Sequence, residues 1–350
     1  MLQPRLPPVP PQARLTREQP ADFRVEEIPA YPASGSGDHV MVTVEKTGLS
    51  TLEVARRLAQ HLGVDGREVG FAGRKDVHAV AVQRFTVPRR KHVRLQPGPL
   101  SAGITILEVA LHKNKLQLGH LHGNRFDILL RVPVVGALER LRERAPQVTR
   151  GVVNYFGPQR FGVDGNNVED GIRVLTGARR GGDPRGLQLL VSAVQSHVFN
   201  LVADFRVRRD PDVLPVTGDI LVKVPSGAPF HCDAPETDAA RVMEGAVAVT
   251  GPLPGSRMRL PRDVPLTWES RILADVLPDP TVLTAGRRAP LGDRRAILVR
   301  PQGIQVDAVP EGIRVRLSLP PGSFATSVLR EWAGILEDGA AGSAASESAG

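Results

Sequence analysis

The sequence has few cysteines and no long apolar run. Cys232 is its only cysteine, which excludes an internal disulfide and any zinc site built mainly from cysteine, and fits a reducing cytoplasm. No apolar run approaches the length of a membrane span, so we expect no membrane association. His120 and His122 lie close together without the cysteine or carboxylate pattern of a metal site, so we expect no bound metal.

Lysine is also scarce, so arginine supplies most of the positive charge behind the net charge of +8. Arginine binds phosphate bidentately and stacks on bases, so an arginine-rich basic chain indicates a nucleic-acid partner. The alternative is a GC-rich genome, which enriches arginine together with alanine, glycine, proline and valine. The length of 350 residues suffices for two or three domains, and the apolar fraction of 41 % suffices for their cores.

The two ends of the chain differ in composition from the middle. The proline-rich segment 1–14 is predicted to be a flexible lead, and the small, polar segment 338–350 is predicted to be disordered. Between them, strands and helices mix without regular alternation, which predicts an α+β fold. The last helix is predicted to start at Ser323, a good N-cap, and to reach Leu336.

One strand and one helix are clear near the N-terminus. Val40–Val44 alternates apolar with other residues, as expected of a strand. Ser50 is predicted to cap the following helix, with Glu53 at the spacing of a capping box, and Gly63 is predicted to end it. Leu52 belongs to the apolar stripe that we expect this helix to bury.

The run Gly73-Arg74-Lys75-Asp76 is the strongest chemical signal in the sequence. Nearby cations favour the ionised form of a carboxylate, so this loop suits a nucleophile or base aimed at a polyanion. The alternative is a surface turn with a solvated ion pair. A nucleotide-hydrolysing phosphate loop is disfavoured, because Gly70 and Gly73 precede Lys75 without the adjacent Gly-Lys-Ser/Thr spacing.

Two later segments combine amide, basic and aromatic side chains. Asn124 and Phe126 start a predicted strand, where an aromatic ring could stack on a nucleobase or simply fill the core. Asn154, Gln159 and Arg160 lie in a glycine-bounded run with three aromatic residues, in a chain whose aromatic content is only 4 %. This mixture is typical of RNA recognition. It is equally compatible with an aromatic-packed turn between domains.

Taken together and in this order, the motifs resemble the tRNA pseudouridine synthase D (TruD) family. The resemblance covers most of the chain. Its motifs are Arg17-x-x-Pro20-x-Asp22-Phe23-x-Val25-x-Glu27, the run Phe71–Asp76, the run Gly123–Phe126, the run Gly151–Gly162, the run Gln195–Asn200 and the run Pro321–Glu331. Any one of them is weak alone, whereas their shared order is specific.

The resemblance implies a fold and its domains. It implies an α+β pseudouridine-synthase catalytic domain with circularly permuted elements and a mixed, mainly antiparallel sheet. Residues 15–154 and 302–337 would form this domain. An α+β domain of residues 155–301 would be inserted into it, and RNA would bind in the cleft between the two.

The resemblance also implies an activity, the isomerisation of a tRNA uridine to pseudouridine, at position 13 in bacterial members. Asp76 would be the catalytic residue, and no cofactor would be required. Phe126 would stack on the target uracil. The other side chains expected to contact substrate are Asn124, Lys75, Arg17, Asn154, Gln159 and Arg160. Arg17 stands where the family usually has lysine, which replaces a point cation with a planar fork.

We expect a cytoplasmic monomer whose partner is tRNA. A non-catalytic RNA-binding module is the main alternative, since it would account for the positive charge and the aromatic residues equally well. It would give Asp76 no chemical role.

Overall fold

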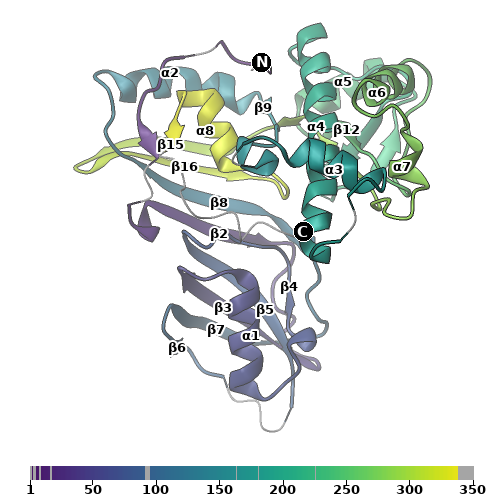
Figure 1. The fold of residues 1–350 in the computed structure, drawn as a ribbon. Coiled ribbons are helices and arrows are strands. Elements are labelled where there is room, and N and C mark those ends of the chain that lie inside the picture. The colour runs from purple at the N-terminus through teal and green to yellow at the C-terminus, as the bar shows by residue number, and fades with distance from the viewer. Residues whose placement is uncertain are drawn as a thin grey trace.

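The large sheet is the main feature of the fold (Figure 1). The computed structural model describes residues 2, 5–7, 9–15, 18–90, 95–162, 164–179, 181–224 and 226–337. The strand order is β15-β16-β8-β2-β5-β3-β7-β6, with the short β4 also paired to β5. Only β2 and β5 run parallel among these pairs. The sheet is therefore mixed and mainly antiparallel, which confirms the predicted α+β class. Its strands are β2 (Phe23–Pro29), β3 (His39–Thr47), β4 (Gly70–Phe71), β5 (Val80–Pro88), β6 (Gly98–Ser101), β7 (Ile104–His112), β8 (Leu121–Leu130), β15 (Gln302–Val309) and β16 (Gly312–Leu319).

Helix α1 (Thr51–Leu62) covers the β3, β5 and β7 end of the sheet, where it shares one apolar core with these strands. Ser50 caps it as predicted, accepting a bond of 3.1 Å from the backbone N–H of Glu53, and Gly63 ends it with a φ of 62°. The capping box is not completed, because the Glu53 carboxylate instead bonds two arginines of the same helix. The prediction that Leu52 is buried is wrong: 47 % of it is exposed.

Helices α2 (Ala137–Thr149) and α8 (Ala325–Ala333) cover the other end of the sheet, over β15 and β16 (Figure 1). Trp332 is fully buried between them and donates its indole N–H to the Leu141 carbonyl at 3.0 Å. Helix α8 is shorter than predicted. It begins after Phe324 rather than Ser323, and it ends at Gly334, whose φ of 55° reverses the chain.

The N-terminal segment packs against this second core. Strand β1 (Arg14–Leu15) pairs in parallel with β17 (Leu336–Glu337). Leu6 is 5 % exposed within the core, and Arg5 bonds Asp212 at 2.6 Å. The described part of residues 1–14 thus differs from the flexible lead expected of it, whereas the predicted disordered tail 338–350 lies outside the described residues.

A second, smaller part of the chain lies beside the large sheet (Figure 1). The chain enters it through β9 (Val152–Val153) and leaves through β14 (Leu298–Val299), and these two strands pair with each other. Between them lies a four-stranded antiparallel sheet of order β11-β10-β12-β13, with helices around it. Its elements are α3 (Asn167–Leu175), α4 (Pro184–Arg209), β10 (Ile220–Lys223), β11 (Pro229–His231), α5 (Pro235–Met243), β12 (Val247–Leu253), α6 (Asp263–Val276), α7 (Thr281–Thr284) and β13 (Asp293–Ala296).

Helix α4 is the central helix of this smaller part. By length and composition it could cross a membrane, contrary to the expectation that no segment reaches that length. However, 56 % of its most apolar window is buried inside the protein, where it contributes to two apolar cores. The same pattern is typical of a core helix in a soluble domain.

Candidate active site

Asp76 lies half-buried in the loop between β4 and β5. The Thr51 hydroxyl accepts a bond of 2.9 Å from the Lys75 backbone N–H and donates one of 2.8 Å to the Gln83 side chain. The Gln83 amide in turn donates to the Gly73 carbonyl at 3.1 Å. Because Thr51 and Gln83 are buried, their bonds tie the backbone on the N-terminal side of Asp76 to the protein interior. The loop is therefore anchored rather than a solvated surface turn.

The neighbouring Lys75 has a different partner from the one that the sequence suggests. Its ammonium group bonds the Glu27 carboxylate at 3.0 Å, and the two side chains are 3 % and 2 % exposed. A buried ion pair of this kind compensates both charges locally. Lys75 therefore ties the Asp76 loop to β2 and does not reach the surface to meet a phosphate.

Lys46 at the end of β3 is a functional candidate that sequence reasoning missed. It is fully buried, and its ammonium group donates to the carbonyl oxygens of Leu49 and Asp76, each at 2.6 Å. Burial lowers the pKa of its amine to about 8, and the charge of Asp76 opposes this change. A buried ammonium group is thus held against the backbone of Asp76 by a hydrogen bond.

Strand β8 brings Asn124 and Phe126 to the same region. In the sheet register, Asn124 pairs with Glu27, the partner of Lys75. The Asn124 Oδ1 atom is buried and has no hydrogen-bond partner among the described residues. Phe126 is 7 % exposed and packs edge-on against Phe23, with ring centroids 5.9 Å apart. Its ring is fixed by the core, and the stacking role expected of it stays a prediction.

Gly123 precedes Asn124 for a steric reason. A Cβ atom at this position would lie 2.3 Å from the carbonyl oxygen of Leu319 on β16. Only glycine permits such a close approach of two backbones. The Gly-Asn pair of the motif therefore combines a packing requirement with a polar side chain.

The glycine-bounded motif after β9 divides into a buried part and an accessible part. Asn154 is buried: its amide group donates to the Ala296 carbonyl at 3.1 Å, and its side-chain oxygen accepts from Arg295 at 2.7 Å. The Arg295 guanidinium lies 4.1 Å from the Phe156 ring centre and also donates to the Gly322 carbonyl. Asn154 thus supports the junction between the two parts of the chain, and the substrate contact expected of it stays a prediction.

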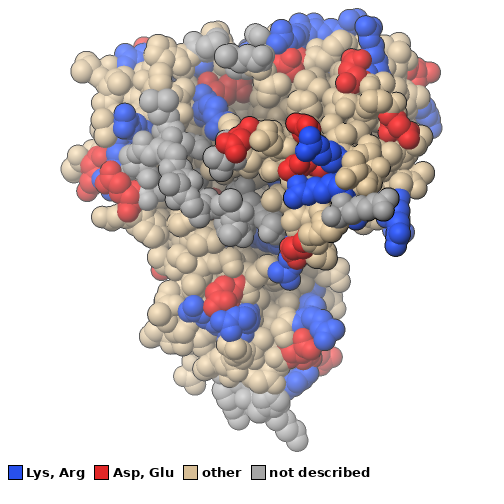
Figure 2. All heavy atoms as spheres, in the orientation of Figure 1, with Lys and Arg blue, Asp and Glu red and all other residues tan. Residues whose placement is uncertain are grey.

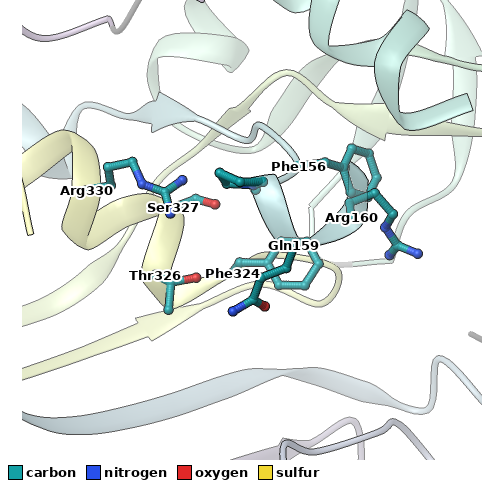
Figure 3. Close-up of a pocket in the computed structure, with 9 residues that line it drawn as sticks. Phe156, Gln159, Arg160, Phe324, Thr326, Ser327 and Arg330 are labelled. Atoms are coloured by element: carbon teal, nitrogen blue, oxygen red, sulfur yellow. The ribbon is translucent and has the colours of Figure 1, made fainter. Parts of the chain in front are cut away.

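Gln159 and Arg160 line an open pocket where this motif meets the start of α8 (Figure 3). Both belong to the short 3-10 helix η3 (Pro158–Phe161). Arg160 and Arg330 lie on opposite sides of the pocket (Figure 3). The remaining lining residues are Phe156, Gly157, Pro158, Phe324, Thr326 and Ser327. Guanidinium groups, hydroxyls and a helix N-terminus together suit an anion such as a phosphate.

The pocket and the Asp76 loop are connected through β16. Leu319, the last residue of that strand, pairs with Asn124 on β8. The chain then reaches the pocket at Phe324. One strand end therefore links the two groups of polar side chains.

Basic side chains also lie outside the pocket. Arg17 lies outside the described residues, and Arg74 is exposed near enough to Arg185 of α4 for the two like charges to interact. On the face drawn in Figure 2, basic and acidic side chains are interspersed over both parts of the chain.

Within the described ranges, no three His, Cys, Asp or Glu side chains gather closely enough to hold a metal ion.

Comparison with known proteins gives one consistent result. Residues 12–179 and 173–332 match the family model of tRNA pseudouridine synthase D (TruD). The tRNA pseudouridine synthase D of an Anaeromyxobacter species is 38 % identical over 322 residues, which cover 90 % of this chain and 91 % of that protein. The Thermus thermophilus protein of the same name is 36 % identical over 315 residues, covering 90 % and 87 %.

A solved structure has the same fold. The crystal structure of a Methanosarcina mazei protein described as a tRNA pseudouridine synthase D superposes with a TM-score of 0.67. The superposition covers 94 % of both chains at 20 % sequence identity. Similarity at this level of identity shows a shared fold.

Proposed function

Because the chain belongs to the tRNA pseudouridine synthase D family, we propose that it converts the uridine at position 13 of tRNA into pseudouridine, with Asp76 as the catalytic residue. The activity shared by the family is the isomerisation of a tRNA uridine. The observation that supports Asp76 is its anchored loop, which Thr51, Gln83 and Lys46 hold. The adjacent Lys75 also bonds Glu27, the strand partner of Asn124.

The reaction begins with access to the base. A uridine stacked inside folded RNA is out of reach, so it must flip out at a cost of a few kcal/mol. Stacking on Phe126 would recover about 1–3 kcal/mol of this cost. The closed site must also keep the detached base from escaping and exclude water from C1′.

The chemistry is an isomerisation without net oxidation. The C1′–N1 bond breaks, a C1′–C5 bond forms, and the proton lost from C5 is balanced by one gained at N1. No electrons or external groups are consumed, so the reaction needs no cofactor. The Asp76 carboxylate has three routes open to it: attack on C1′, addition to uracil C6, or removal of the C2′ proton.

Asn124 is proposed to hydrogen-bond the flipped nucleotide through its buried side-chain oxygen. Substitution Asn124→Leu removes a polar atom that has no partner among the described residues, so the thermal midpoint should stay unchanged or rise. The rate of pseudouridine formation should fall by about tenfold or more, since a substrate contact is lost. Single-turnover kinetics and thermal unfolding test both parts, and a large loss of stability with an unchanged rate would contradict the proposal.

The pocket at η3 is proposed to hold backbone phosphates next to the target nucleotide. Gln159 and Arg160 would act there together with Arg330 and the start of α8. Arg17 is proposed to add positive charge near the same strand of RNA. Lys75 supports the Asp76 loop through Glu27 instead of meeting RNA directly.

We also propose the domain division. Residues 15–154 and 302–337 would form the catalytic domain and residues 155–301 the inserted domain, since β9 and β14 pair where the chain leaves and returns. We further propose that the protein is cytoplasmic, is a monomer and acts without a metal.

Detection of pseudouridine in tRNA tests the proposed function. The purified protein is incubated with unmodified tRNA transcripts, and pseudouridine is then detected by carbodiimide labelling. Labelled tRNA is the expected result. Tight tRNA binding without any labelled product would favour the non-catalytic RNA-binding module.

The affinity for tRNA should depend steeply on salt. Each phosphate neutralised by a basic side chain releases counterions, so about four contacts give a log–log slope near −3. Filter binding at increasing potassium chloride measures this slope. A flat profile would mean that the excess of arginine reflects genome composition.

A further inference from the structure

The buried charge of Lys46 is a feature that the proposed function leaves unexplained. Burying a lysine completely is costly, because its ammonium charge leaves water. The alternation of Val42 and Val44 along β3 places Lys46 on the same inward face. Its ammonium group bonds the carbonyl oxygens of Leu49 and Asp76, so it spans the end of β3 and the loop before β5.

The charges facing Lys46 come mainly from the Asp76 loop. On the flanking strands, Lys46 pairs with Ala81 of β5 and Ile104 of β7, and neither of these side chains is titratable. Asp76 stabilises the Lys46 charge, and Lys75 opposes it. Lys75 is itself compensated by Glu27. Asp76 is therefore the acid to which the buried Lys46 charge is coupled.

We propose that Lys46 is a positioning residue for the isomerisation: it fixes the backbone at Asp76 through its bond to the Asp76 carbonyl, and it adds a buried positive charge that is coupled to the Asp76 carboxylate. This inference rests on the proposed catalytic role of Asp76. Lys46 acts through Asp76 and touches neither the uracil nor the sugar.

Protonation of Lys46 gives activity and stability opposite pH dependences. Burial lowers the pKa of Lys46 to about 8, so the charge is lost as the pH rises through that value, and the rate should decline. The folded pKa lies below the ordinary lysine value, so the unfolded chain binds more protons in the interval between them. The contribution of Lys46 to stability therefore rises over the same pH range.

The test is Lys46→Met in the full-length protein, assayed by single-turnover pseudouridine formation from about pH 6 to about pH 10. At neutral pH the rate should fall about 10- to 100-fold, the scale expected when a reacting group is displaced. The affinity for tRNA should stay within a few-fold, and the thermal midpoint should be unchanged or higher, because a buried charge is removed. The decline of the wild-type rate near pH 8 should be absent in the variant.

Gln83→Leu is the matched control. It removes a neutral side chain that bonds the Gly73 carbonyl of the same loop. This variant should lower the rate while keeping the wild-type decline near pH 8. A Lys46→Met protein with the wild-type rate and pH profile would overturn the inference and leave the proposed function intact.

A second measurement does not depend on activity. Nitrogen-15 NMR of lysine-labelled protein follows the titration of Lys46, with Lys46→Met assigning the signal among the few lysines of the chain. Asp76→Asn should move this titration to lower pH, because the stabilising charge of Asp76 is lost. An unmoved titration would overturn the coupling. A wild-type protein that forms no pseudouridine would defeat the proposed function, while the NMR result would still decide whether Lys46 is coupled to Asp76.

Discussion

Asp76→Asn is expected to abolish pseudouridine formation, lowering the single-turnover rate by about a thousandfold or more. The amide keeps the size of the side chain but is neither a nucleophile nor a base. The loop contacts made by Lys46, Thr51 and Gln83 do not involve the Asp76 side chain, so the fold should persist. The affinity for tRNA should stay within a few-fold of wild type, measured by filter binding.

Asp65→Asn provides the control for this substitution. Asp65 precedes the short 3-10 helix η2 (Gly66–Glu68), where it caps the backbone N–H of Arg67 at 2.7 Å. Asparagine is an equally good cap, so this variant should keep near-normal activity. Residual activity of Asp76→Asn close to that of the control would remove Asp76 from the mechanism.

Lys75→Met should destabilise the protein by about 3–5 kcal/mol, the usual cost of leaving one charge of a buried pair without its partner. The substitution leaves the Glu27 carboxylate buried beneath the Asp76 loop. The double variant Lys75→Met with Glu27→Gln should recover much of this loss, since neither charge of the buried pair then remains. Urea unfolding followed by circular dichroism measures the free energies.

The exposed pair of Arg125 on β8 and Glu26 on β2 is the control, because Glu26 is the neighbour of Glu27 and its bond of 2.7 Å lies in solvent. Its loss through Arg125→Met should cost less than about 1 kcal/mol. If Lys75→Met costs no more than Arg125→Met, the buried pair does not anchor the loop as the geometry indicates.

Local signals in the sequence predicted part of the fold. Ser50 and Gly63 mark the two ends of α1, because capping depends on residues adjacent in the chain. Leu52 lies on the exposed face of α1, because the apolar residues of a short helix are compatible with more than one orientation of its buried face. The preference of helix caps for serine favours Ser323 as the cap of α8, whereas the observed cap residue is Phe324.

Contacts between segments far apart in the chain could not be predicted from the sequence. The pairing of Lys75 with Glu27 depends on the register of the large sheet, which no local pattern fixes. The packing of Leu6 depends on α8, at the far end of the chain. The bond between Asn154 and Arg295 also joins residues far apart in the chain, so no local pattern predicts it.

Lys46 did leave a signal in the sequence. It continues the alternation of Val40, Val42 and Val44, so the strand pattern places a lysine on the buried face. A charged residue at an inward position calls for a buried partner. That partner, the Asp76 loop, became evident only when β3 and β5 were seen to pair.

Mapping of pseudouridine at single-nucleotide resolution tests the central claim most directly. One unmodified tRNA transcript with uridine at position 13 is incubated with the wild-type protein or with Asp76→Asn, without added cofactor. The expected result is pseudouridine at position 13 with the wild-type protein and none with the variant. Absence of pseudouridine with the wild-type protein, its formation only at another position, or equal yields from the two proteins would contradict the proposed function.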